Sequence, residues 1–174
     1  TSDIAEFVFQ GYDGSANQYK EYMRIGNSGI VTTPSQPSAN VYVNSGNAGA
    51  YNNAGSNSVI IATGIRHNTG SHYSTSTGHF TCPVSGRYMV TFSGNWYNNS
   101  AGSYIRPQIQ KNATTITQHY ETMVSGQSWV HIGASTIIDC SASDYLRIYN
   151  STASGAGGGM DLVAYSNITF QLVS

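Results

Sequence analysis

Side chains that could perform catalysis are few in this sequence and widely spaced. Its histidines form no H-x-H or H-E-x-x-H pattern and no cysteine–histidine cluster with zinc spacing, and they are His67, His72, His79, His119 and His131. Zinc centres need such spacing because several ligands must converge on one ion. We therefore expect isolated histidines and no metal site. The alternative is that His131 meets its symmetry mates on a trimer axis and binds a metal there.

The acidic residues show no pair suited to general acid–base catalysis. Asp3, Glu6 and Asp13 lie near the N-terminus, and the other five acids are scattered. Hydrolysis by two carboxyl groups requires both at the same bond, one as acid and the other as base or nucleophile. We expect a protein that is not an enzyme and needs no cofactor.

The two cysteines, Cys82 and Cys140, are too few for a disulfide scaffold. Both fall on alternate positions that face the predicted core. The simplest interpretation is two buried thiols that pack as small hydrophobic side chains. A disulfide between them is the alternative.

The composition excludes several classes of protein. Charged residues make up 9% of the 174 residues, and 7 Lys and Arg oppose 8 Asp and Glu. Such a chain lacks the basic patch of a nucleic-acid binder and of a polybasic membrane-surface protein. No apolar run approaches the ~20 residues of a membrane span, so we expect no membrane insertion. The chain begins at Thr1 without an initiator methionine, which predicts a processed product or a fragment.

Polar uncharged residues and tyrosine replace the missing charge. The chain has 24 Ser, 16 Thr and 15 Asn, together with 13 Tyr and 19 Gly. Ser, Asn and Gly are mediocre in helices, whereas Thr, Tyr and Val suit strands. Apolar residues alternate with polar ones in five segments, which are 86–93, 104–111, 128–140, 145–149 and 167–173. This period of two predicts half-buried strands and an all-β sandwich or barrel.

The face assignment follows from the same alternation. It places Phe92 and Phe170 inward, on two separate strands. Pro107 lies within a strand pattern, which predicts an edge position or a bulge because proline cannot donate to the ladder.

Charge divides the chain into two parts. Six charged residues lie within 1–24, and none lies within 25–65. Pro34 and Pro37 fall in this uncharged stretch and punctuate the chain. We therefore predict an N-terminal segment, residues 1–33, and a main domain, residues 34–174.

One long segment carries a family resemblance. Residues 77–92, Thr-Gly-His-Phe-Thr-Cys-Pro-Val-Ser-Gly-Arg-Tyr-Met-Val-Thr-Phe, resemble the globular head of the complement first-component q subunit, which shares a jelly roll with tumour necrosis factor. Residues 109–112 and 167–173 are similar to two further motifs of that family. The sequence departs from the family at Asn112–Ala113, where the family has Asn-Gly, and at Ser143–Asp144, where it has Gly-Asp. The resemblance implies a homotrimeric jelly-roll β-sandwich with both termini at the base and loops at the apex.

A second resemblance lies in residues 22–37, which are similar to a linker of bacteriophage tail-fibre and virion appendage proteins. This resemblance implies a short β-rich fibre segment before the head. It also implies a virion location and other virion structural proteins as partners, with a secreted, extracellular complement-like head as the alternative. We expect residues 1–33 to order only within the trimer.

Low charge and outward aromatic residues indicate the subunit interface. The residues expected there are Met23, Ile25, Trp129, His131, Tyr145 and Tyr149. For Tyr145 and Tyr149 we favour the interface over glycan stacking, whereas for Tyr120 the two interpretations are equal.

If the C-terminus lies at the base, counting strands back from it predicts at which end of the molecule each loop lies. It places 151–164, 112–127 and 83–86 at the apex, and 141–144 and 95–103 at the base. Because loops carry function on a rigid scaffold, we expect the apical loops to bind a host surface component, most simply a glycan. The candidate ligand-binding residues are Thr117, His119, Tyr120, Glu121 and Asp161. A purely structural capsid decoration or knob is the alternative function.

Overall fold

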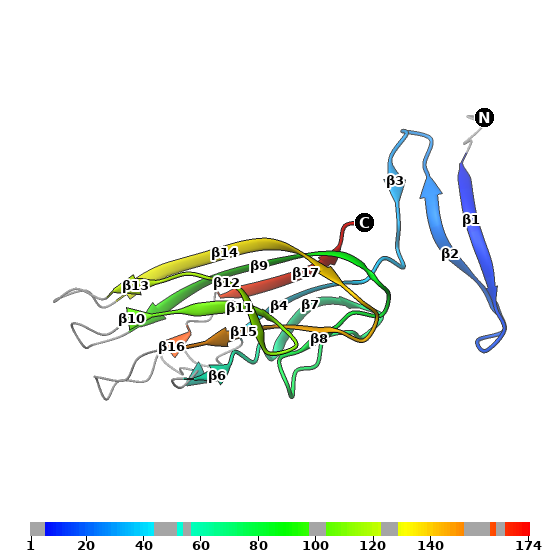
Figure 1. Ribbon diagram of the computed structural model, residues 1–174. Coiled ribbons are helices and arrows are strands. Elements are labelled where there is room, and N and C mark those ends of the chain that lie inside the picture. The colour runs from blue at the N-terminus through cyan, green and yellow to red at the C-terminus, as the bar shows by residue number, and fades with distance from the viewer. Residues whose placement is uncertain are drawn as a thin grey trace.

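The computed structural model describes residues 6–43, 52–53, 57–97, 104–122, 129–151, 161–162 and 166–174. All regular elements in these residues are strands, as the composition predicts. They form two parts that Figure 1 separates clearly: an arm, residues 6–33, and a head, residues 34–174. The described part of the chain contains no helix that could cross a membrane.

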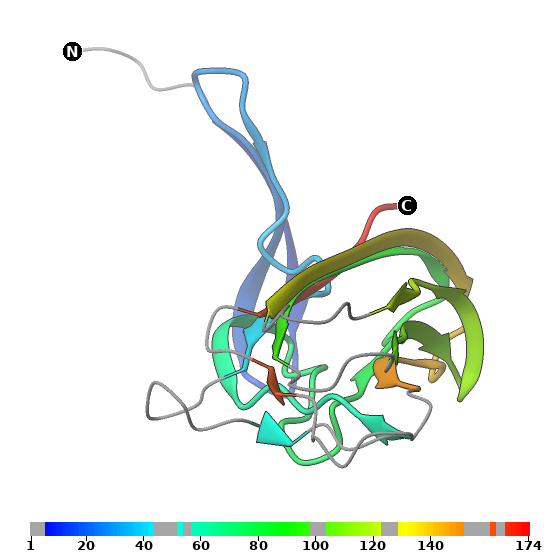
Figure 2. The ribbon, with the colours of Figure 1, turned by 90° about the vertical axis from the view of Figure 1, so that its left-hand side faces the viewer.

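The head is built from two main antiparallel sheets. The larger has seven strands in the order β5-β16-β9-β17-β4-β7, with β14 paired to the other edge of β9. Figure 2 looks onto one end of the head and shows the strands of the two sheets on opposite sides, and the core side chains pack between them. The bounds of the larger sheet are β4 (Ser38–Tyr42), β5 (Asn52–Asn53), β7 (Gly64–Thr69), β9 (Gly86–Tyr97), β14 (Trp129–Cys140), β16 (Asp161–Leu162) and β17 (Asn167–Leu172).

The smaller sheet has five strands in the order β12-β11-β15-β6, with β8 also paired to β15. A separate two-stranded ladder joins β10 to β13. The bounds of these elements are β6 (Ser58–Val59), β8 (Phe80–Thr81), β10 (Tyr104–Ile105), β11 (Pro107–Lys111), β12 (Thr114–Gln118), β13 (Glu121–Thr122) and β15 (Tyr145–Asn150). Two facing antiparallel sheets joined by crossing strands form the jelly-roll sandwich that the sequence predicts.

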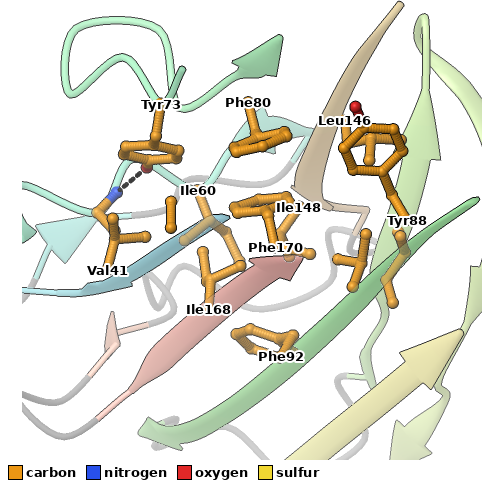
Figure 3. Close-up of a cluster of buried hydrophobic side chains, with 14 of the residues drawn as sticks. Val41, Ile60, Tyr73, Phe80, Tyr88, Phe92, Leu146, Ile148, Ile168 and Phe170 are labelled. Atoms are coloured by element: carbon orange, nitrogen blue, oxygen red, sulfur yellow. Dashed lines mark hydrogen bonds between the residues drawn. The ribbon is translucent and has the colours of Figure 1, made fainter. Parts of the chain in front are cut away.

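The inward faces of both sheets pack into one hydrophobic core, as the alternation predicts. Phe170 is fully buried, and its ring stacks on that of Phe80, with centroids 5.0 Å apart, in the layer shown in Figure 3. Tyr73 joins this layer, and its hydroxyl accepts a hydrogen bond from the Ala62 amide at 2.9 Å. Burial raises the pKa of Tyr73 to about 12, so this phenol stays neutral.

Pro107 is the first residue of β11, a central strand of the smaller sheet. The predicted edge position is therefore wrong. A proline is tolerated here because the strand begins with it, so no ladder donor is lost further along. Its carbonyl still accepts a hydrogen bond from the His119 amide at 3.0 Å.

The arm is a three-stranded antiparallel sheet with the order β1 (Phe7–Asp13), β2 (Gln18–Ile25) and β3 (Val31–Thr32). Among the described residues, every member of the buried hydrophobic core belongs to the head. The first residues of the head join the two parts: the Ser35 hydroxyl donates to the Glu21 carbonyl of β2 at 3.0 Å, and Gln36 donates to the Leu172 carbonyl near the C-terminus.

The two departures from the family motif fall on residues with positive φ. Asn112 (φ 48°) and Ala113 (φ 65°) form the two-residue turn between β11 and β12, and Ser143 (φ 73°) lies in the turn before β15. Successive positive φ angles are typical of the tight hairpin turn that favours Asn-Gly. Alanine in this region is strained because its Cβ crowds the following carbonyl.

Replacing Ala113 with glycine should therefore stabilise the head. Relief of strain contributes about 1–2 kcal/mol, and the greater freedom of glycine in the unfolded chain costs about 0.4–1 kcal/mol, so the net gain lies between about zero and about 1.6 kcal/mol. Denaturant unfolding of the Ala113→Gly variant measures this gain. A variant less stable than the parent would contradict the strained turn.

Candidate recognition surface

Among the described residues, side chains that could perform chemistry come together at most in pairs, and the thiols of Cys82 and Cys140 are one such pair. Among the residues described, no three His, Cys, Asp or Glu side chains come together as metal ligands. Cys82 and Cys140 are both buried and both free, and burial raises the pKa of each thiol. Thiols of this kind are poorly reactive because the thiolate is the nucleophile.

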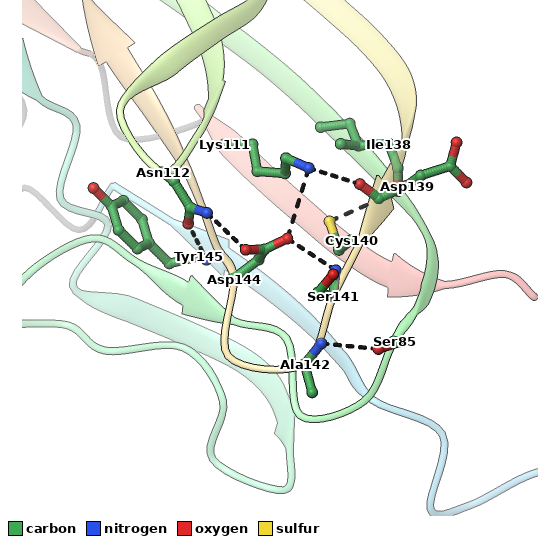
Figure 4. A network of polar contacts seen from close by, with 10 residues as sticks. All are labelled: Ser85, Lys111, Asn112, Ile138, Asp139, Cys140, Ser141, Ala142, Asp144 and Tyr145. Atoms are coloured by element: carbon green, nitrogen blue, oxygen red, sulfur yellow. Dashed lines mark hydrogen bonds and ion pairs between the residues drawn. The ribbon is translucent and has the colours of Figure 1, made fainter.

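Asp144 joins two turns of the head by hydrogen bonds, the turn at Asn112–Ala113 and the turn at 141–144 (Figure 4). Its carboxylate accepts hydrogen bonds from Asn112 Nδ2 at 2.6 Å and the Ser141 amide at 2.8 Å, and Lys111 Nζ lies 3.6 Å away. The bond from Asn112 is the largest cause that lowers the pKa of Asp144. Stability from a lowered carboxyl pKa is present above the unfolded-state value and is lost as the pH falls through the folded-state value. This acid therefore serves the fold.

Strand directions define the two ends of the head. β17 ends at Leu172 beside the start of β9, where the Arg87 amide donates to the Ser174 carbonyl at 2.7 Å. We call this the basal end. β9 then runs to Tyr97, which pairs with Trp129 at the opposite, apical end. In Figure 1 the basal end lies next to the arm, and the apical end lies at the far left.

Three of the predicted loop placements are wrong. The turn at 83–86 is basal, the connection from β9 to β10 that includes 95–103 begins and ends at the apex, and the turn at Asn112–Ala113 is basal. The cause is β12, which lies inside the segment 112–127 that the sequence predicts as a single loop. One uncounted strand inverts every placement N-terminal to it. Turn 141–144 is basal as predicted, and β15 and β17 border the apical segment 151–164.

Four candidate ligand residues still gather at the apical end, because β12 returns the chain there. These are Thr117 at the end of β12, His119 and Tyr120 in the following turn, and Glu121 on β13. Tyr120 is 56% exposed and stacks on Tyr104, with ring centroids 4.8 Å apart. Glu121 Oε2 lies 3.8 Å from His119 Nε2. The result is an aromatic pair beside a polar edge.

Asp161 lies in a different sheet from β12 and β13, which hold or flank these four residues. It lies on β16, in the larger sheet, where its backbone pairs with Tyr97 and Asn53. Its side chain, residues 123–127 and most of 151–164 lie outside the described residues, so a joint site with Tyr120 stays a prediction.

The predicted interface residues occupy three surfaces. Met23 and Ile25 lie on the arm. His131 lies on the outer face of the larger sheet and contacts Asn95 Oδ1 at 2.8 Å and Ser93 Oγ at 3.2 Å, while the neighbouring Trp129 side chain is outside the described residues. Tyr145 and Tyr149 lie on the outer face of the smaller sheet, which is the opposite side of the sandwich. The two groups therefore lie on opposite faces of one chain, and their place in a trimer interface stays a prediction.

The arm has one apolar face. Register pairs Phe7 with Ile25, Phe9 with Met23, and Ile25 with Val31, so these five side chains share a face. Phe7, Phe9 and Val31 are 67%, 55% and 57% exposed. We call these five residues the arm face.

The opposite side of the arm is polar. Arg24 forms ion pairs with Glu6 at 2.6 Å and with Glu21 at 2.7 Å. The rings of Tyr12 and Tyr19 meet edge to face beside them. The sheet is therefore amphipathic, and within the described chain its apolar side is uncovered.

Sequence reasoning missed Arg147. Its guanidinium carbon lies over the Tyr145 ring at 5.8 Å and over the Tyr149 ring at 5.3 Å, and its Nε donates to Gln110 Oε1 at 2.9 Å. The signal was present in the alternation of β15, since a Tyr-x-Arg-x-Tyr pattern puts one arginine between two aromatic rings on the outward face.

Comparison with known proteins agrees with this architecture. The C1q domain profile matches residues 40–147, which is more than half of the chain. The chain belongs to the C1q domain family. No curated relative matches it.

Solved structures of the same fold are similar over most of the chain. The globular domain of zebrafish complement 1qA protein has a TM-score of 0.60 at 15% identity and covers 80% of this chain and 98% of its own. Eiger TNF from S. frugiperda has a TM-score of 0.58 at 15% identity, with coverages of 80% and 93%. Murine APRIL has a TM-score of 0.58 at 8% identity, with coverages of 79% and 99%. At these identities the likeness shows the fold alone. It confirms the C1q and tumour-necrosis-factor type of jelly roll.

Proposed function

We propose that the protein is a homotrimeric recognition head without enzymatic activity, and that its apical end binds a component of a host-cell surface. Domains of the C1q and tumour-necrosis-factor type are typically binding modules that form trimers, and the C1q match covers residues 40–147 of the head. The apical pair of Tyr104 and Tyr120 beside polar side chains suits a neutral glycan, because stacking and directional hydrogen bonds need no charge.

The similarity of residues 22–37 to virion appendage linkers supports a place on a virion, next to other virion structural proteins. A secreted complement-like head is the alternative, and the fold shared with zebrafish complement 1qA protein is equally consistent with it. Residues preceding Thr1 in the natural protein would distinguish the two. Collagen-like Gly-X-Y triplets favour the secreted head, and β-fibre repeats favour the virion.

The observation that best supports a trimer is the exposed arm face. Exposing an apolar surface to water is unfavourable in free energy, and a small isolated sheet without a core of its own is only marginally stable. Three arms around a common axis would bring three such faces together and continue the trimer of the head. The polar side, with its Arg24 ion pairs, would then face solvent. Met23 and Ile25 keep their proposed role, and Phe7, Phe9 and Val31 join them.

Charge on the arm face should therefore weaken the trimer. We expect wild-type protein at micromolar concentration to have the mass of about three chains, as obligate interfaces bury roughly 2,000–5,000 Å². Phe9→Asp would bury an unpaired charge, at a cost of several kcal/mol, and should raise the dissociation constant of the trimer at least about tenfold. Light scattering over a dilution series measures this effect.

Tyr12→Asp is the matched control for Phe9→Asp. Tyr12 lies on the same strand, is 57% exposed against 55% for Phe9, and belongs to the polar side. It should leave the mass unchanged. Equal dissociation of both variants would show that the arm face is not buried between chains. A stable wild-type monomer would refute the trimer itself.

A further inference from the structure

The outer face of the smaller sheet carries a built cationic site that lies apart from the apical end and from the arm face. Its centre is Arg147, in the middle of β15, with Tyr145 and Tyr149 on either side along the strand. The guanidinium carbon lies 5.8 Å and 5.3 Å from the two ring centroids, within the range of cation–π attraction. The bond from Nε to Gln110 uses one side of the guanidinium group, so its two terminal NH2 groups are the donors that a ligand would meet.

Neighbouring amides hold Arg147 in place. The guanidinium can only donate, so the oxygen of Gln110 must face it, and Nε donates there at 2.9 Å. The other end of that amide then donates to Gln108 Oε1 at 2.8 Å, and Gln108 Nε2 donates to Gln118 Oε1 at 3.1 Å. Gln110 and Gln108 are only 5% and 9% exposed. Buried amides in one directed chain are costly to rearrange, so the guanidinium is preorganised.

No acidic side chain neutralises this cation within the described part of the chain. The ion pairs there join Arg24 to Glu6 and Glu21 and Lys111 to Asp144, and none includes Arg147. His79 stacks on Tyr145 with centroids 4.3 Å apart, and its pKa is lowered first by burial and then by Arg147. The nearest imidazole therefore favours its neutral form, and Arg147 is the charge that a ligand would meet.

We propose that Arg147 binds the carboxylate of an acidic sugar, such as a uronic or sialic acid, on this outer face. The planar edge of a guanidinium matches a carboxylate with two parallel hydrogen bonds. The tyrosine hydroxyls and Gln118 Nε2 lie on the same face of the sheet, and hydroxyl and amide groups are the partners that sugar hydroxyls need.

A protein partner fits this face less well. Among the described residues, no large exposed hydrophobic side chain lies on β11 or β15. Stable protein interfaces have an apolar centre, whereas a small polar ligand requires only directed polar groups. The site thus extends recognition from neutral groups at the apex to an acidic group on the flank.

Binding of free sugars tests this site in the intact protein. Glucuronic acid and N-acetylneuraminic acid should bind at millimolar concentration and shift the Arg147 Nε–H resonance in NMR titrations. Methyl glucoside, which is neutral, should leave that resonance in place. Because the contact is ionic and half exposed, added salt should weaken the binding of both acids.

Two substitutions separate a fitted site from a simple positive charge. Arg147→Gln should weaken binding of both acids roughly tenfold or more, and Arg147→Lys should lose most of that affinity although the charge is kept, because lysine has no planar fork. Calorimetry with the free acids measures both losses, and unfolding curves establish that each variant is folded.

Arg66→Gln is the matched control. Arg66 also lies over a tyrosine ring, that of Tyr42 at 5.3 Å, but on the larger sheet and with one ring only. Its loss should not change binding. Equal affinity of wild type and Arg147→Gln, equal affinity of Arg66→Gln and Arg147→Gln, or no binding of either acid would overturn the proposal. The apical site would be unaffected by that result, since it uses other residues. Capture of sulfate with the same affinity as the acids would likewise overturn the choice of a carboxylate.

Discussion

Phe170→Ala should destabilise the head by about 3–5 kcal/mol, the largest stability loss that we expect from a single substitution. The ring is fully buried in β17, stacks on Phe80 at 5.0 Å with an interplanar angle of 7°, and lies 5.9 Å from Tyr73. Its removal leaves a cavity between the two sheets, and the stacked partners lose a contact that no neighbour can replace. Phe92→Ala, on the adjacent strand β9, should cost a similar amount.

The effect should reach the trimer as well as the fold. An obligate assembly has no stability apart from its subunits, so a weakened core appears as poor assembly or faster unfolding. Thermal unfolding at fixed protein concentration measures the loss. Gln171→Ala is the control, because Gln171 is the exposed neighbour on the same strand. A change in melting temperature of a degree or less in both phenylalanine variants would show that these rings do not hold the sheets together.

The strand alternation in the sequence predicts this core well, because a period of two is a property of each strand alone. β14 illustrates this: Ile132, Ile138 and Cys140 are buried as predicted, while His131 and Ile137 face outward. Such a pattern needs no knowledge of the partner strand. The C1q motif at 77–92 then selects one fold among the sandwiches.

Topology was less predictable from the same residues. The segment Thr114–Gln118 has mostly polar side chains and only one large apolar residue, Ile116, which is 42% exposed. β12 is an edge strand that packs little into the core, so its sequence resembles a loop. The two-residue turn before β12 also lacks the usual sequence signal of a hairpin, because Ala113 stands where glycine is expected.

One candidate site could be predicted from the sequence, and the other could not. Tyr120 could be found from the sequence because it follows a run of polar residues near a loop. The arrangement around Arg147 depends on Gln110, which lies on another strand and becomes its neighbour only through the β11–β15 register. Cross-strand partners of this kind are set by the fold, so alternation within β15 indicated the face but not the hydrogen bond beneath it.

Removing the apical aromatic platform should sharply reduce attachment to host cells. Tyr120 is exposed and stacked on Tyr104, so its ring is already oriented before a ligand arrives, and Glu121 supplies an acceptor on the adjoining strand. A shallow site of this kind should bind one sugar at millimolar affinity, about −4 kcal/mol per chain. Three copies on one tip raise avidity by about 10² or more where the ligand spacing permits.

Tyr120→Ala combined with Glu121→Ala should remove about 2 kcal/mol per site, or roughly thirtyfold in affinity, because stacking and a hydrogen bond are both lost. Loss at three sites together multiplies the effect on attachment, and adsorption of the protein to host cells measures it.

The control is Ile116→Ala, which changes an exposed residue earlier on β12 and should adsorb like wild type. Moderate salt should change wild-type adsorption through the apex little, since no ion pair with the ligand is needed there. Undiminished adsorption of the double variant would place recognition elsewhere on the head, and an equal loss in Arg147→Gln would show that attachment requires the acidic-sugar site on the flank as much as the apex.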